Sequence, residues 1–145
     1  MGLRLLLIVF GFFSGSVMYG KLLPKWLKGI DVTAISQDKN PGTANAMQYA
    51  GVPVGVLCLL CDLAKGTLPV MLFCALFGLE PTFWLSFAVA APVLGHTCSP
   101  WGGGKGIAVS FGVMLGLLPG SMGLLFLIGS YLLFSIIIRI KPHGI

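Results

Sequence analysis

Four long apolar runs, separated by one long and several short polar segments, occupy most of this 145-residue chain. They span residues 3–19, about 46–63, 67–95 and 107–140. Only 9% of the residues are charged, with nine Lys or Arg and four Asp or Glu, whereas a soluble domain has about 25%. Because so few charges cannot cover a soluble fold, we predict an all-α, polytopic membrane helical bundle of about four to six spanning or broken helices. We expect residues 1–145 to form a single integral membrane domain.

Two of the apolar runs contain internal breaks. Residues 67–95 would form a straight helix of about 43 Å, but a bilayer has a hydrocarbon core of about 30 Å. Glu and Pro at residues 80–81 interrupt this run, and Pro-Gly at residues 119–120 interrupts the last one. The second run is expected to end in the polar residues between 62 and 66. The third run can therefore be one broken span or two short helices.

The positive charges flank the apolar runs. They are Lys21, Lys25, Lys28 and Lys39 in the polar segment after the first run, and Arg139 and Lys141 after the last. Under the positive-inside rule these segments face the cytoplasm. The lysines are not interleaved with exposed aromatic residues, so membrane lipids and phosphorylated substrates are expected as partners and nucleic acid is not. If residues 67–95 cross the membrane once, the polar loop 96–106 faces the same side, which we expect because a shared site needs the two loops together.

The four cysteines include one CxxC pair, Cys58 and Cys61. The pair lies inside an apolar run, with no second pair and no His nearby. We therefore interpret these cysteines as packing residues and expect no metal site.

Two polar segments are typical of anion sites. The segment Asn-Pro-Gly-Thr-Ala-Asn at residues 40–45 precedes an apolar run, where a helix start offers free N–H groups and a positive dipole end. The segment Trp-Gly-Gly-Gly-Lys-Gly at residues 101–106 lets the backbone approach an anion and adds a positive charge. His96 precedes it and could act as an acid or base, or could cap a helix. The alternatives are an ordinary capped turn and a flexible loop; a Walker A loop is excluded by Ser99 and Gly106.

Asp62 and Lys65 form the third polar group. Three residues apart, they share one helix face and can pair. Ionisable residues within a membrane are functional candidates. The alternative is a helix-end ion pair that marks the membrane interface.

The order of these motifs resembles the bacterial acyl-phosphate-dependent glycerol-3-phosphate acyltransferases, the PlsY family. Four blocks match in order: residues 15–20, residues 40–45 with Gly51, residues 62–70, and residues 95–96 with 103–106 and Gly112. The resemblance covers roughly half of the chain. Each block is weakly specific alone, but the four together are strongly specific.

The resemblance implies transfer of a fatty acyl group from acyl phosphate to glycerol 3-phosphate, which gives lysophosphatidic acid for phospholipid synthesis. It implies a multi-pass protein of the bacterial cell membrane with its site on the cytoplasmic side, and no cofactor or metal. The His-x4-Asp motif of other acyltransferases is absent, since Trp101 stands five residues after His96. The candidate catalytic residues are His96 and Lys105, and the candidate substrate-binding or phosphate-binding residues are Asn40, Gly42, Thr43, Asn45, Asp62, Lys65, Gly103 and Gly104.

This chain departs from the family pattern at identifiable places. Gln48 stands where the family has Arg, and the loop between His96 and Lys105 is about three residues shorter. The 145 residues also lack the family's final helix and its polar block, as expected of a shortened, divergent member. The alternative function is a non-catalytic paralogue that binds a phosphorylated metabolite or lipid and acts as a sensor or subunit; a small transporter or a metal-dependent phosphotransferase fits less well. The oligomeric state stays open.

Overall fold

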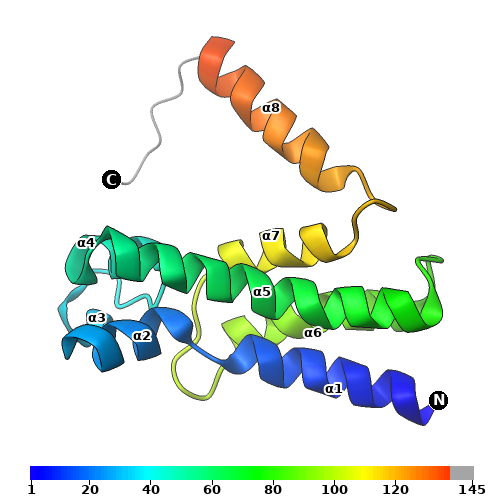
Figure 1. Ribbon diagram of the computed structural model, residues 1–145, viewed down its shortest axis with the longest axis horizontal. Coiled ribbons are helices and arrows are strands. Elements are labelled where there is room, and N and C mark those ends of the chain that lie inside the picture. Colours follow the sequence, from blue (N-terminus) through cyan, green and yellow to red (C-terminus); the bar gives the residue numbers. More distant parts are fainter. Residues whose placement is uncertain (138–145) are drawn as a thin grey trace.

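The computed structural model describes residues 1–137 as helices joined by turns, with no strand in this range (Figure 1). The helices are α1 (Gly2–Ser16), α2 (Tyr19–Lys28), α3 (Val32–Ile35), α4 (Thr43–Ala50), α5 (Val52–Phe77), α6 (Phe83–Thr97), α7 (Ile107–Gly116) and α8 (Gly123–Ile137). The predicted all-α class is therefore confirmed. The expected anchors Arg139 and Lys141, and the end of the last apolar run, lie outside the described residues.

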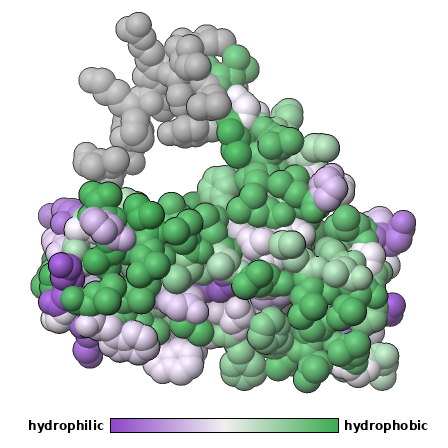
Figure 2. Space-filling model, in the orientation of Figure 1, coloured by the Kyte–Doolittle hydropathy of each residue, from purple (hydrophilic) through white to green (hydrophobic). Residues whose placement is uncertain are grey.

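Helix α5 is long and apolar enough to cross a membrane alone. Its 26 residues measure about 39 Å as a regular helix, more than the hydrocarbon core of about 30 Å. Helices α1 and α2 are long and apolar enough to cross a membrane only if they are taken together, and the pair is bent by 46° at its break. Helices α6 and α7 are shorter apolar helices. Large apolar side chains such as Leu60, Leu68 and Phe83 are exposed, and apolar colour covers much of the visible surface in Figure 2. This surface suits lipid as the surrounding solvent.

Glycines let the helices pack with their backbones in contact. A Cβ on Gly95 of α6 would collide with the Phe12 carbonyl of α1, and a Cβ on Gly112 of α7 would lie 2.9 Å from the carbonyl carbon of Leu63 in α5. Only a residue without a side chain allows such an approach. The close approach of α1 to α6 and of α5 to α7 therefore depends on glycine at these positions.

The expected end of the second apolar run at residues 62–66 is wrong. Helix α5 continues through this segment and through Pro69. Proline has no N–H, so the carbonyl of Lys65 loses its partner within the helix. The hydroxyl of Ser14 on α1 donates to this carbonyl at 3.1 Å. A contact from another helix thus helps to support the continuous helix, which the local sequence did not indicate.

The breaks expected at residues 80–81 and 119–120 are confirmed. Helix α5 ends before Gly78, which has a φ of 81°, and the Thr82 hydroxyl caps α6 by accepting from the Leu85 N–H. Because α6 returns antiparallel to α5, loop 98–106 lies at the same end of the bundle as the segment 36–45 (Figure 1). The two polar loops are therefore together, as the sequence predicted.

Candidate functional site

The polar end of the bundle holds a cluster of candidate residues from two loops. Lys105 Nζ lies 2.9 Å from Asp38 Oδ2, and both side chains are largely exposed. A Cβ on Gly104 would lie 3.3 Å from Asn40 Oδ1. The glycine loop and the segment before α4, more than sixty residues apart in the chain, therefore meet at one surface.

The segment before α4 is held in shape by its own hydrogen bonds. Asn45 Nδ2 donates to Asp38 Oδ1 and to the Asn40 carbonyl, both at 2.7 Å. Lys39 has a φ of 50°, in the left-handed region, which lets the chain turn between its two neighbours. Helix α4 then starts after Gly42 with no side chain capping it, which leaves N–H groups at its first turn. Thr43 Oγ1 is buried without a hydrogen-bond partner.

Asp38 carries a carboxylate whose pKa is lowered by its hydrogen-bond partners. The hydrogen bond from Lys105, and next those from Asn45 and the Asn40 N–H, lower the pKa of Asp38 to about 2. Sequence reasoning missed this residue, because a single Asp in a polar segment carries no motif. Only the neighbouring loop shows that it partners the candidate lysine.

Gly104 lies directly against His96. The Gly104 N–H donates to the His96 carbonyl at 3.3 Å, and a Cβ on Gly104 would collide with His96 Nε2. His96 is only 4% exposed, at the end of α6. The buried imidazole therefore packs against the inner side of the glycine loop, with Nε2 directed at Gly104.

Two further contacts join this loop to the α1–α2 region. Ser99 Oγ donates to the Ser16 carbonyl at 2.8 Å in a buried position, and Lys21 Nζ donates to the Trp101 carbonyl at 3.3 Å. No motif singled out Ser99 as a binding residue. These bonds give the glycine-rich segment a defined position despite its composition.

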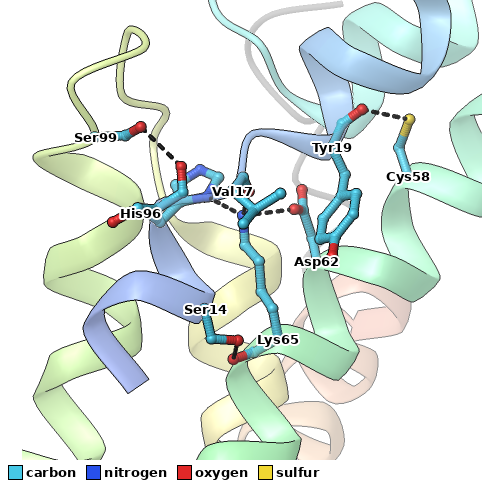
Figure 3. A network of polar contacts seen from close by, with 9 residues as sticks. Ser14, Val17, Tyr19, Cys58, Asp62, Lys65, His96 and Ser99 are labelled. Atoms are coloured by element: carbon cyan, nitrogen blue, oxygen red, sulfur yellow. Dashed lines mark hydrogen bonds and ion pairs between the residues drawn. The ribbon is translucent and has the colours of Figure 1, made fainter. Parts of the chain in front are cut away.

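A buried polar network lies beneath the surface cluster (Figure 3). Lys65 Nζ and Asp62 Oδ1 of α5 are 2.9 Å apart, with side chains 2% and 3% exposed. The same Nζ lies 2.8 Å from His96 Nδ1 and donates to the Val17 carbonyl. The sequence pattern placed this ion pair on one face correctly, but gave no indication of the acceptors on α6 and on the α1–α2 connection.

The break between α1 and α2 explains why a lysine lies inside the bundle. Helix α1 ends at Ser16 and α2 begins at Tyr19, so carbonyls at the break lack helical partners. Lys65 satisfies the carbonyl of Val17. The thiol of Cys58 lies nearby and donates to the carbonyl of Tyr19, the first residue of α2, at 3.5 Å. Unsatisfied carbonyls are costly at membrane depth, and α5 supplies the donors. Cys58 is fully buried, in keeping with a packing role.

The structure thus sorts the predicted site residues into two layers. The upper layer contains Asn40, Gly42, Thr43, Asn45, Gly103, Gly104 and Lys105; the lower layer contains Asp62, Lys65 and His96. His96 connects the layers, because one ring nitrogen faces Lys65 and the other faces Gly104. Within residues 1–137, no group of three or more His, Cys, Asp or Glu could hold a metal ion.

Comparison with known proteins gives consistent matches. The family model described as glycerol-3-phosphate acyltransferase matches residues 5–143. The glycerol-3-phosphate acyltransferase of Myxococcus xanthus is 40% identical over 116 residues, which cover 78% of this chain and 59% of that protein. The enzyme of the same name from Thermotoga petrophila is 39% identical over 109 residues, which cover 73% of this chain and 54% of that protein. The chain therefore spans a little over half the length of these curated relatives.

Solved structures give the same result. The crystal structure of PlsY (YgiH), an integral membrane glycerol 3-phosphate acyltransferase, in its glycerol 3-phosphate form superimposes with a TM-score of 0.80 and 31% identity. The match covers 92% of this chain and 66% of that one. A second form of PlsY, with lysophosphatidic acid, gives a TM-score of 0.77 and 30% identity. The helical bundle found here is therefore that of a membrane protein.

Proposed function

Because the chain belongs to the glycerol-3-phosphate acyltransferase family, we propose that it moves a fatty acyl group from acyl phosphate to glycerol 3-phosphate. The product is lysophosphatidic acid, a precursor of phospholipids. The proposal includes one integral membrane domain in a bacterial cell membrane, with the site at the cytoplasmic side. It rests on the family match, on the order of the four sequence blocks and on one geometric observation.

That observation is the meeting of the two polar loops. Lys105 and Gly104 from one loop, and Asn40 from the other, lie at one surface above His96. Both substrates carry phosphate, and this surface offers a lysine, glycine backbone and the uncapped start of α4. Such groups recognise phosphate oxygens. We assign phosphate binding to Asn40, Gly42, Thr43 and Asn45, and a second anion position to Lys105 with Gly103 and Gly104.

The proposed reaction needs little beyond orientation and charge. The 1-hydroxyl oxygen of glycerol 3-phosphate forms a bond to the acyl carbonyl carbon, and the bond from that carbon to the phosphate oxygen breaks. Inorganic phosphate leaves, and the hydroxyl proton ends on it. Holding two anions close together is unfavourable in water, so Lys105 and the loop N–H groups contribute by neutralising and aligning them.

The buried pair takes a supporting role in this proposal. Asp62 and Lys65 are almost fully buried and paired with each other, so we assign them to holding His96 and the α1–α2 break in place. Direct phosphate contact by Lys65 is the less favoured assignment, because Nζ is already surrounded by acceptors.

Turnover by the purified full chain tests the proposal. Reconstituted protein is given acyl phosphate and glycerol 3-phosphate, and lysophosphatidic acid and inorganic phosphate are measured together. Lys105→Ala is expected to raise KM for glycerol 3-phosphate roughly 10-fold or more, since hydrogen bonds to charged groups contribute about 1.5–3 kcal/mol. Lys25→Ala, at an exposed site on α2, is the matched control and leaves KM unchanged. Absence of turnover, with the Myxococcus xanthus enzyme active alongside, would refute the proposal.

Gln48 favours a second candidate, a non-catalytic protein that binds a phosphorylated metabolite or lipid. This exposed residue on α4 stands where the family resemblance implies Arg, so the phosphate site has one positive charge fewer. The second candidate predicts calorimetric binding of glycerol 3-phosphate without turnover, abolished by Lys105→Ala. The acyltransferase predicts turnover that rises in Gln48→Arg.

A further inference from the structure

The Lys65 ammonium lies within a shell of acceptors. An ammonium group has three N–H donors and accepts nothing. Around Nζ lie the Val17 carbonyl, the Asp62 carboxylate at 2.9 Å and His96 Nδ1 at 2.8 Å (Figure 3). The Tyr19 ring lies on a further side, with its centroid 5.6 Å away, where a ring face attracts a cation. The ammonium therefore donates to the Val17 carbonyl and lies at hydrogen-bond distance from His96 Nδ1, whereas its contact with Asp62 is an ion pair that leaves Asp62 Oδ1 without a hydrogen bond.

This arrangement determines which nitrogen of His96 carries the proton. A neutral imidazole has one N–H donor and one acceptor nitrogen. Since Lys65 donates toward Nδ1, that nitrogen must be the acceptor, and the hydrogen of the neutral ring is on Nε2. A doubly protonated ring would direct an N–H at the ammonium, with like charges in contact inside the bundle.

The opposite edge of the His96 ring, which carries Nε2, lies against the candidate site. Nε2 faces Gly104, next to the position of Asn40 Oδ1. A ring with its hydrogen on Nε2 presents a donor there, and a donor favours an anion or a carbonyl oxygen over a hydroxyl proton.

We infer that Lys65 is a positioning residue that holds His96 in its Nε2–H tautomer, so that the imidazole offers the glycine loop a hydrogen-bond donor and not a base. Asp62 holds the ammonium in this position and balances its charge. The inference rests on the proposed acyl-transfer site only for its consequence in catalysis. The tautomer itself is a property of the substrate-free protein.

Nitrogen NMR of the full chain tests the inference without turnover. The protein is labelled with ¹⁵N-histidine in detergent micelles, with His143→Gln to leave the signals of His96. Near pH 7.5 we expect the unprotonated nitrogen to be Nδ1, which couples to one ring proton, and the protonated nitrogen to be Nε2, which couples to two. A ring protonated on Nδ1, or on both nitrogens, would overturn the inference whatever the enzyme activity.

Variants then test whether Lys65 is the cause. Removing Lys65 alone would strand a buried carboxylate, so Asp62→Leu with Lys65→Met removes the pair together. We expect this double variant to show a mixture of both tautomers and a kcat/KM up to about 100-fold lower, since misplacing a positioned group by about 1 Å can cost that much. Lys25→Met is the control and keeps the Nε2–H tautomer. Retention of the pure tautomer in the double variant would refute the role of Lys65, and if that variant does not fold, the wild-type spectrum still decides the tautomer.

If wild-type protein shows the Nε2–H tautomer but no turnover, the proposed function fails and the positioning inference stands. If the protein turns over substrate but Nδ1 carries the proton, the proposed function stands and the positioning inference fails.

Discussion

Replacing Gly112 by alanine is expected to separate α7 from α5. The added Cβ would collide with the carbonyl oxygen of Leu63, its nearest neighbour, and would lie 2.9 Å from the carbonyl carbon and 3.0 Å from Cα, whereas carbon atoms in contact prefer about 3.5–4.0 Å. The atoms in the way are backbone of a long helix, so no side chain can rotate to make room. Helix α7 must shift by roughly 0.5–1 Å.

Overpacking and a weakened hydrogen bond set the size of the effect on stability. Overpacking of this kind costs about 1–3 kcal/mol, and the hydrogen bond from Thr67 Oγ1 to the Gly112 carbonyl, 2.8 Å long, is worth about 0.5–1.5 kcal/mol. Alanine recovers up to about 1 kcal/mol through its helix propensity. We expect the free energy of unfolding to fall by about 1–3 kcal/mol.

Denaturant titration in detergent micelles, followed by circular dichroism, measures this change. Gly129→Ala on α8 is the matched control, because a Cβ there meets no atom within 4 Å, and no loss is expected. Since α7 begins just after Lys105, KM for glycerol 3-phosphate is expected to rise in Gly112→Ala only. Equal stability of Gly112→Ala and wild type would refute the close helix contact.

Three further predictions concern the polar end. Gly104→Ala should displace His96, because the new Cβ collides with Nε2. We expect kcat/KM to fall by up to about 100-fold, the cost of misplacing a positioned group by about 1 Å, and unchanged kinetics would contradict the contact. Asp38→Asn should free Lys105 for phosphate and lower KM about two- to five-fold. The pKa of Asp38 is lowered from near 4 in the unfolded chain to about 2 in the folded protein. The ion pair with Lys105 is therefore fully formed above pH 4 and is lost only as the pH falls through 2. The decrease in KM should accordingly be the same at pH 6 and pH 8. Cys98 is exposed in the loop, whereas the other cysteines lie in α5. A membrane-impermeant maleimide should therefore label Cys98 in inverted vesicles but not in intact cells. Labelling in intact cells would place the loop, and the site with it, on the outer side of the membrane.

The sequence by itself determined the class of the fold and the order of its polar blocks. Thirteen charged residues among 145 are too few to cover the surface of a soluble protein. The apolar side chains that remain on the surface are stable only in contact with lipid. The breaks at residues 80–81 and 119–120 followed from local chemistry, since proline cannot donate to the preceding turn. The anion-type loops were recognisable for the same reason, as glycine, asparagine and lysine act locally.

Only the tertiary structure decided what Asp62, Lys65 and His96 do. From the sequence, an ionisable pair among apolar residues was expected to end a helix, because charges avoid lipid. In the fold, the Val17 carbonyl at the α1–α2 break and His96 Nδ1 of α6 lie against the ammonium, and the Ser14 hydroxyl donates to the carbonyl that Pro69 leaves unpaired. Likewise Asp38 acquires its role from Lys105, 67 residues away. These partners are distant in the chain, so no local pattern encodes them. The packing of α1, α5 and α6, and the meeting of the two polar loops, bring them together.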